Sequence, residues 1–191
     1  WHGLVLKGVF NGAERRNRLG RAAAQRAGAG KLRILNGTAL LVMTDINFYH
    51  LTARPLEWAL PKLLEKSLQA EARVVVMASS EERVADLNAH LWTFDQDSWL
   101  PHGSEKDGNA ELQPIWLTIA DENPNQARFL FLTDGAVSGH VGDYERVFEL
   151  FDGRNDDAVK AARARWKDYK TAGHTLAYWR QTESGGWEKA G

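Results

Sequence analysis

The segment Val159–Lys170, which reads VKAARARWKDYK, combines basic and aromatic residues at a spacing that favours an anionic partner. Residues three or four positions apart lie on one face of an α-helix. As a helix, the segment gathers the following side chains on one face, which we call the cationic ridge: Val159, Lys160, Arg163, Trp166, Lys167 and Lys170. Ala158, Ala162 and Tyr169 lie roughly opposite and are expected to face the protein body. Such a ridge suits an anionic partner that carries an aromatic group; the alternative is a helix face that is merely solvated.

No motif in the sequence indicates catalysis or metal binding. The six histidines form neither H-E-x-x-H nor a close pair, and the chain has no cysteine to serve as a nucleophile or ligand. The segment Gly135–Gly139 places Ser138 next to the second glycine, so the G-x-S-x-G nucleophile motif is not met. The segment Arg26–Lys31 (RAGAGK) lacks the glycine and hydroxyl residues of a phosphate-binding loop. We therefore predict no cofactor, no metal and no enzymatic activity, although scattered carboxylates leave a dispersed active site open.

Charge is distributed unevenly along this chain of 191 residues, whose formal net charge is −1. Residues 1–42 hold eight Lys or Arg and a single acidic residue, whereas the remainder carries 16 basic and 24 acidic residues. Met43 is followed at once by the strand-like segment DINFYHL. We therefore predict that the basic Arg/Ala/Gly-rich leader 1–42 is not part of the native domain. Residues 43–191 are expected to form a single domain, with a C-terminal tail from about residue 181.

From residue 45 onward, apolar patterns predict strands that alternate with helices. The continuous β-branched run Arg73–Ala78 is typical of a strand that is covered on both faces. Further strands or short apolar segments are predicted at 45–51, 98–102, 114–119 and 128–133, and helices at 55–68, 81–92, 143–151 and 156–173. Thr175–Trp179 is expected to be a final strand or a packed tail. The alternation predicts an α/β sandwich around a mainly parallel sheet.

Four segments together resemble the chi subunit family of bacterial DNA polymerase III. They read NFYHL, LNAHLWTFDQDSWLPH, RVFELFDG and ARARWKDYKTAGHTLAYW, and they follow the family's order between Met43 and about Trp179. The D-S-W-L-P-H block and the A-R-x-R-[WY]-K-x-Y-[RK]-x-A-G block are the most specific of these. The resemblance implies a Rossmann-like three-layer sandwich without a nucleotide-binding motif. It also implies a non-catalytic accessory subunit of the clamp loader, active in DNA replication.

The resemblance further implies partners and contact residues. A chi subunit pairs with the psi subunit of the clamp loader and bridges it to single-stranded DNA-binding protein, whose acidic C-terminal tail ends in phenylalanine. By position, Arg163 and Lys167 would receive the terminal carboxylate and nearby acids of that tail. Trp92 and Trp166 would form the walls of the phenylalanine pocket. Trp99 would contact psi and also a helicase-like partner. The chain would contact DNA only indirectly, through its protein partners.

Two other hypotheses remain open at this stage. Aromatic and cationic side chains bind single strands by stacking and charge, so the leader and the cationic ridge could bind single-stranded nucleic acid directly. A nucleotide-dependent enzyme is supported by fold class alone. No apolar run approaches the roughly 20 residues that span a bilayer, and no signal peptide is apparent. The expected location is therefore the cytoplasm, without a membrane partner.

Overall fold

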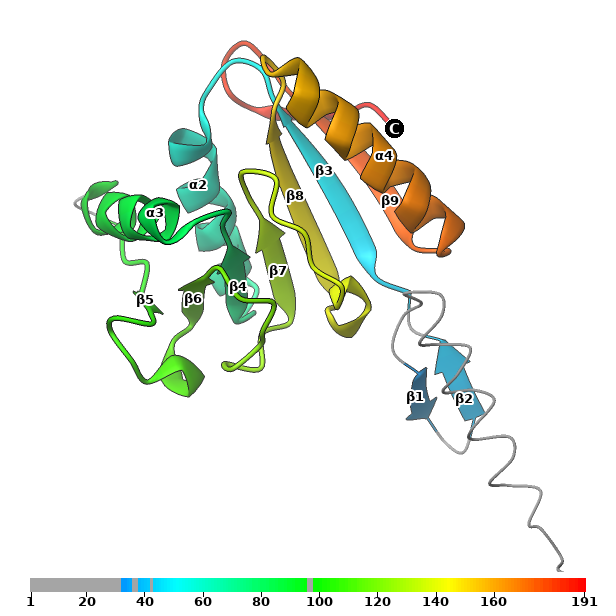
Figure 1. Cartoon of the computed structure of the whole chain (residues 1–191), viewed down its shortest axis with the longest axis horizontal. Coiled ribbons are helices and arrows are strands. Elements are labelled where there is room, and N and C mark those ends of the chain that lie inside the picture. The colour runs from blue at the N-terminus through cyan, green and yellow to red at the C-terminus, as the bar shows by residue number, and fades with distance from the viewer. Residues whose placement is uncertain (1–31, 36–37, 42, 96–97) are drawn as a thin grey trace, which may run out of the picture.

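The computed structural model describes residues 32–35, 38–41, 43–95 and 98–191 (Figure 1). The strands are β1 Leu32–Leu35, β2 Thr38–Leu41, β3 Asp45–Leu51, β4 Val74–Met77, β5 His102–Ser104, β6 Ile115–Thr118, β7 Phe129–Leu132, β8 Arg146–Asp152, β9 Thr175–Gln181 and β10 Trp187–Lys189. The helices are α2 Leu56–Gln69, α3 Glu81–Thr93 and α4 Asp156–Thr171, with short 3-10 turns at Ala110–Leu112 and Val141–Asp143. The predicted helices 55–68, 81–92 and 156–173 are thus confirmed.

Strands β3 to β10 form one sheet in the order β10-β9-β3-β8-β7-β4-β6-β5. Neighbouring strands are parallel throughout, except that β10 pairs with β9 in the antiparallel sense. The mainly parallel sheet expected from the sequence is therefore confirmed. β1 and β2 form a separate antiparallel pair. Most of the leader lies outside the described residues, so its exclusion from the native domain stays a prediction.

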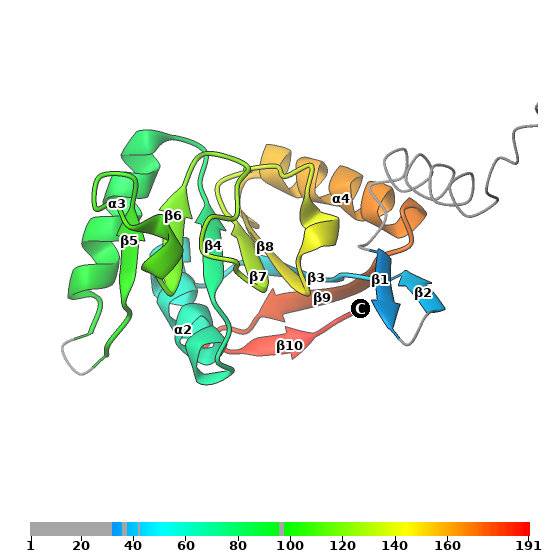
Figure 2. The ribbon, with the colours of Figure 1, turned by 90° about the horizontal axis from the view of Figure 1, so that it is seen from below.

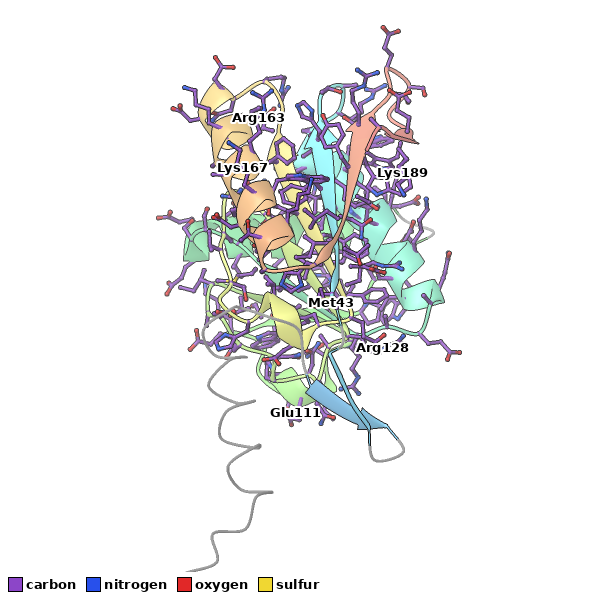
Figure 3. All side chains as sticks on the ribbon, turned by 90° about the vertical axis from the view of Figure 1, so that its right-hand side faces the viewer. Met43, Glu111, Arg128, Arg163, Lys167 and Lys189 are labelled. Atoms are coloured by element: carbon purple, nitrogen blue, oxygen red, sulfur yellow. The ribbon has the colours of Figure 1, made fainter. Side chains whose placement is uncertain are left out.

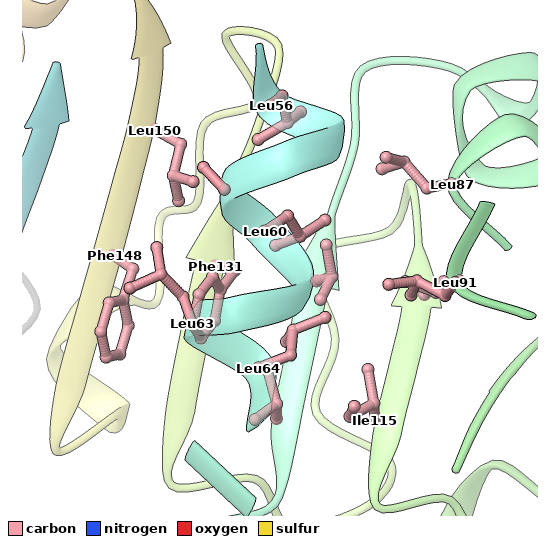
Figure 4. Packing of buried hydrophobic residues seen from close by; sticks show 14 of the residues in the cluster. Leu56, Leu60, Leu63, Leu64, Leu87, Leu91, Ile115, Phe131, Phe148 and Leu150 are labelled. Atoms are coloured by element: carbon pink, nitrogen blue, oxygen red, sulfur yellow. The ribbon is translucent and has the colours of Figure 1, made fainter. Parts of the chain in front are cut away.

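Helices cover both faces of the sheet, as Figure 2 shows for α2 and α4. On one face, leucines of α2 and α3 pack onto alternate residues of the strands, including Phe131, Phe148 and Leu150 (Figure 4). On the other face, Ala162 of α4 and the residues of the intervening strands, including Phe48 and Val147, form a second core. Strands that lie between the two cores, such as β4 and β8, thus send successive side chains into different cores, as the period of two in a strand requires. The result is the Rossmann-like three-layer sandwich.

The helix predicted at 143–151 is wrong. Residues Arg146–Asp152 form β8, which pairs with β3 on one side and β7 on the other. The misleading pattern is the dense apolar run from Val147 to Phe151, whose spacing fits one helix face as well as a strand buried on both sides. Tertiary context decides in favour of the strand, because β8 occupies the middle of the parallel sheet.

The C-terminal segment is also part of the sheet. Thr175–Gln181 forms β9, which pairs in parallel with β3, and a tight turn leads into β10 at the sheet edge. Thr182 and Gly186 close this turn with a backbone hydrogen bond of 2.9 Å. The residues after 181, for which the sequence offered no role, therefore complete a hairpin.

The start of α4 is held by Asn155, the residue before its first turn. The Asn155 side-chain oxygen accepts hydrogen bonds from the backbone N–H groups of Asp157 at 3.0 Å and Ala158 at 3.2 Å. Asp156 and Asp157 in the first turn, with Lys170 in the last turn, match the sign of the helix dipole. These features fix where α4 begins over the sheet.

We expect Asn155→Ala to lower the free energy of unfolding by about 1 kcal/mol, because two backbone N–H groups lose their acceptor. Asn155→Asp, which keeps an acceptor at the same position, is the matched control. Urea denaturation followed by circular dichroism measures both variants. Equal stabilities for the alanine and aspartate variants would contradict the assignment of this cap.

Candidate functional site

A pocket of about 300 Å³ opens between α4 and the strands β3, β8 and β9. Its lining comprises Phe48, His50, Phe151, Val159, Ala162, Arg163, Trp166 and Tyr178. Phe48 and His50 lie two residues apart on β3, so strand geometry turns both toward α4. We call this the α4 pocket.

Aromatic rings form the inner surface of the α4 pocket. The Phe48 ring lies edge-on to Trp166 with ring centroids 5.1 Å apart, and edge-on to Phe151 at 6.5 Å. The His50 ring stacks on Phe151 at 4.9 Å with an interplanar angle of 15°. An apolar cavity of about 150 Å³ is enough to bind benzene. The α4 pocket can therefore accept a single aromatic side chain.

The polar groups of the pocket are Arg163, His50 and Tyr178. Arg163 is solvent-exposed on α4, while the His50 Nδ1 atom and the Tyr178 hydroxyl share a hydrogen bond of 2.6 Å. Burial lowers the pKa of His50, and the neighbouring Arg163 and Arg180 lower it further. The imidazole is therefore neutral at pH 7, and Arg163 is the permanent positive charge at the pocket.

The cationic ridge is divided by the structure. Arg163 lines the pocket, whereas Lys160, Lys167 and Lys170 are exposed on α4 and do not line it. Figure 3 shows Arg163 and Lys167 on the same helix, with Lys167 further along it. Lys160 forms an exposed ion pair with Asp157 at 3.3 Å. Only one cation of the ridge is thus positioned at the pocket itself.

The predicted division of α4 into two faces needs one correction. Ala162 and Tyr169 pack toward the body as expected, but Val159 and Trp166 also pack against the same core. Both residues lie at the border between the two faces of α4, and side chains at this border still contact the sheet on which the helix packs. Trp166 is therefore a wall of the pocket and not an indole presented on an open ridge.

Trp92 does not line the α4 pocket, so the structure does not bring it together with Trp166, as the resemblance had implied. It lies near the end of α3, is 58 % exposed and contacts the ring of His102 on β5 at 4.7 Å. Four strand spacings separate β5 from β8, a distance of about 19 Å. Arg163, Lys167 and Trp166 are thus brought together on one helix, and Trp92 is left at the far edge of the sheet.

Trp99 lies in the connection between α3 and β5, at the same edge of the sheet as Trp92. Its side chain is 75 % exposed, the highest value among the large exposed hydrophobic residues of the described chain. Exposed aromatic residues of this size are enriched at the centres of protein interfaces. The structure therefore contains a second candidate surface, which we call the β5-edge surface and define by Trp92 and Trp99.

The sequence did not identify four members of the α4 pocket: Phe48, His50, Phe151 and Tyr178. The alternation of NFYHL could have shown that Phe48 and His50 share one face of a strand. Phe151 was hidden by the wrong helix prediction. Tyr178 could only be placed once β9 was known to lie beside β3.

A buried ion pair fixes α4 to the sheet next to the pocket. The guanidinium of Arg165 contacts the Glu149 carboxylate on β8 through Nε at 2.7 Å and through a terminal nitrogen at 2.6 Å. The two side chains are only 15 % and 2 % exposed. Burial raises the pKa of Glu149 despite the attraction of Arg165. This pair holds the helix that carries Arg163 and Trp166.

Within the described part of the chain, no group of three or more His, Asp or Glu side chains is arranged to hold a metal ion. Of the helices described, none has both the length and the apolar character required to cross a bilayer. The α4 pocket combines an aromatic cavity with one cation, Arg163, beside it.

Comparison with known proteins identifies the family of the chain. Residues 43–177 match the family described as DNA polymerase III chi subunit, HolC. A Rickettsia prowazekii protein named "Probable DNA polymerase III subunit chi" is 31% identical over 110 residues, which cover 56% of this chain and 67% of that protein. The DNA polymerase III subunit chi of Pseudomonas aeruginosa is 26% identical over 139 residues, covering 70% of this chain and 94% of that protein. The chain belongs to the DNA polymerase III chi subunit family.

Proposed function

We propose that this chi subunit is a non-catalytic accessory subunit that links the clamp loader to single-stranded DNA-binding protein. In this proposal the α4 pocket receives the terminal phenylalanine of the acidic tail of that protein. The observation that carries the proposal is the aromatic cavity of about 300 Å³ with Arg163 beside it. A C-terminal phenylalanine offers the two complementary groups, a phenyl ring and a free carboxylate, on a single residue.

The free-energy contributions expected for the bound tail correspond to a moderate affinity. Burying one phenyl ring contributes roughly 1.5–3 kcal/mol. A charge-assisted hydrogen bond from Arg163 to the carboxylate contributes about 1.5–3 kcal/mol where it is shielded from water. Exposed Lys167 can attract the acidic residues before the terminus, each worth about 0–1 kcal/mol. Because ordering a flexible tail offsets part of this gain, we expect a dissociation constant on the order of micromolar that rises with salt.

Calorimetric titration of the protein with an acidic peptide that ends in Pro-Phe tests this function. The same peptide without its final phenylalanine, and the same peptide with an amidated C-terminus, are the controls. Micromolar binding by the full peptide and its loss in both controls is the expected result. Equal binding of all three peptides would show that charge alone attracts the tail and that the pocket is not used.

The psi subunit is the partner proposed for the β5-edge surface. Support comes from the exposure of Trp99 and Trp92 at the edge of the sheet remote from the α4 pocket. Separate surfaces would allow one chi subunit to hold both partners at once. A helicase-like protein would compete with psi for this surface.

We expect Trp99→Ala to weaken psi binding at least tenfold, an effect typical of an aromatic residue at an interface centre. The variant should leave the thermal midpoint and the affinity for the tail peptide unchanged, because Trp99 is largely in solvent. Surface plasmon resonance with immobilised psi measures the first effect, and calorimetry measures the second. Loss of tail binding in the same variant would mean that the two surfaces are not independent.

A further inference from the structure

A second groove lies on the opposite face of the sheet, between α2 and the C-terminal hairpin of β9 and β10. Its volume is about 500 Å³. Helix α2 contributes Trp58, Lys62 and Lys66, which follow one another at intervals of four residues and so share one helix face. The hairpin contributes Trp179 and Trp187. We call this the hairpin groove.

Aromatic rings from neighbouring strands line the hairpin groove in a row that runs perpendicular to the strands. Trp179 on β9 stacks on Tyr49 of β3 with centroids 6.1 Å apart and an interplanar angle of 8°. Tyr49 stacks in turn on Phe148 of β8 at 5.8 Å. Trp187 stands edge-on to Tyr49 at 4.7 Å. Trp58, Trp179 and Trp187 are each only partly buried, so indole surface remains accessible in the groove.

The charges around the groove are of one sign. Lys62, Lys66 and Arg146 line it and are exposed, and no acidic residue of the described chain lines it. Lys62 Nζ lies 3.6 Å from the centroid of the Trp58 ring, and the Arg146 guanidinium lies 5.4 Å from that of Phe129.

None of these three cations has an ion pair with a described carboxylate, whereas Arg83, Arg128 and Arg165 are all held by carboxylates. The groove therefore keeps its positive charge available for a ligand on a domain that is otherwise rich in acidic residues.

The C-terminal hairpin places one more cation on the same face of the sheet as the groove, and its turn packs against α2. Lys189 pairs directly with Trp179 in the antiparallel ladder, so its side chain lies on the face of the groove. Figure 3 shows Lys189 on the far side of the sheet from Arg163 and Lys167. Gly185, in the hairpin turn with φ of +89°, lies so close to Trp58 that a Cβ atom would come within 2.5 Å of the indole. The turn is thus seated directly on α2.

We propose that the hairpin groove binds a short stretch of single-stranded nucleic acid. Partly exposed indole rings beside unpaired cations suit a ligand that alternates flat bases with phosphates, because bases stack on aromatic side chains while Lys and Arg neutralise the backbone. The groove is separate from the α4 pocket and does not rest on the function proposed for that pocket. Its extent limits it to a few nucleotides, which is compatible with the acidic charge of the remaining surface.

Photo-cross-linking of the full chain to a 12-nucleotide oligothymidylate that carries 5-iodouracil tests the proposal. Mass spectrometry locates the cross-linked residues, so binding elsewhere on the chain does not obscure the result. We expect cross-links at Trp187, Trp179 or Trp58, with a yield that falls as salt rises. Contacts with about three phosphates predict a slope near −2 when the logarithm of affinity is plotted against that of salt concentration.

Two double variants make the test quantitative. Lys62→Gln/Lys66→Gln removes two cations of the groove without disturbing the core, and Lys160→Gln/Lys170→Gln removes two exposed lysines from α4 on the other face. We expect the first pair to reduce the cross-link yield in the groove at least fivefold and the second pair to leave it unchanged.

Cross-links found only at Trp166 or within residues 1–42 would overturn the proposal. So would competition by polyglutamate as effective as that by unlabelled oligothymidylate, since it would identify an acidic protein segment as the occupant.

Discussion

Replacing Arg165 by methionine is expected to lower the free energy of unfolding by about 3–5 kcal/mol, the loss found when one partner of a buried ion pair is removed. This loss of stability comes from the Glu149 carboxylate, which stays buried after its partner is removed. Glu149 is 2 % exposed, its Oε1 atom accepts both contacts from Arg165, and its Oε2 atom has no hydrogen-bond partner among the described groups. Without the guanidinium, a charge would remain buried beneath α4 with nothing to compensate it.

The Glu149 carboxyl also determines how the stability of Arg165→Met depends on pH. Burial raises the pKa of Glu149 in the folded protein, so the folded state takes up a proton more readily than the unfolded chain. The penalty for the unpaired carboxylate is therefore complete well above that raised pKa and is relieved as the pH falls through it. We expect the stability deficit of Arg165→Met to shrink as the pH is lowered through the raised pKa of Glu149, as measured by urea denaturation over a series of pH values.

Two controls separate this mechanism from simple loss of packing. Glu149→Gln/Arg165→Met removes both charges and should recover much of the lost stability. Arg154→Met removes an arginine from the solvent-exposed pair with Asp152 and should have little effect. A double variant that is less stable than Arg165→Met would contradict the account of a stranded charge.

Replacing Arg163 by alanine is expected to weaken binding of the tail peptide roughly tenfold, equivalent to about 1.4 kcal/mol. Among the described residues, Arg163 is the only arginine that lines the α4 pocket, and its guanidinium can bind both oxygens of a terminal carboxylate. Its exposure keeps the expected effect at the lower end of the range for charged hydrogen bonds. Calorimetric titration at low and at physiological salt measures the change.

Lys160→Ala is the matched control for this prediction. Lys160 lies on the same helix, is equally charged and is exposed, but it does not line the pocket. Its replacement should change the affinity by less than about twofold. Arg163→Lys should fall between the two, because an ammonium keeps the charge but loses the planar fork. Equal losses for the Arg163 and Lys160 variants would indicate that only net charge on the helix matters.

Sequence patterns predicted the secondary structure correctly where a pattern is compatible with a single type of element. The run of valines within Val74–Met77 predicts a strand that is covered on both faces, and the structure confirms this strand. The run Val147–Phe151 was ambiguous, because a strand buried on both sides and a helix give similar apolar spacing. The order of strands in the sheet then decided what local pattern could not.

The candidate site shows the same division. Arg163 and Trp166 were found because both lie on one helix, where spacing in the sequence translates directly into spacing in space. The resemblance grouped Trp92 with these residues, but the strand order sets β5 at the opposite edge from β9, so Trp92 lies apart from them. The hairpin groove was not foreseen either, because it requires Trp58 on α2 to meet the turn at Gly185, more than a hundred residues later.

The most direct test of the central claim is to locate the phenyl ring of the bound tail peptide. Intermolecular nuclear Overhauser effects from a peptide labelled at its terminal phenylalanine would do so. The α4 pocket predicts contacts with the rings of Phe48, Phe151 and Trp166, and none with Trp92. Contacts with Trp92 or Trp99 instead would place tail binding at the β5-edge surface and contradict the assignment of the α4 pocket.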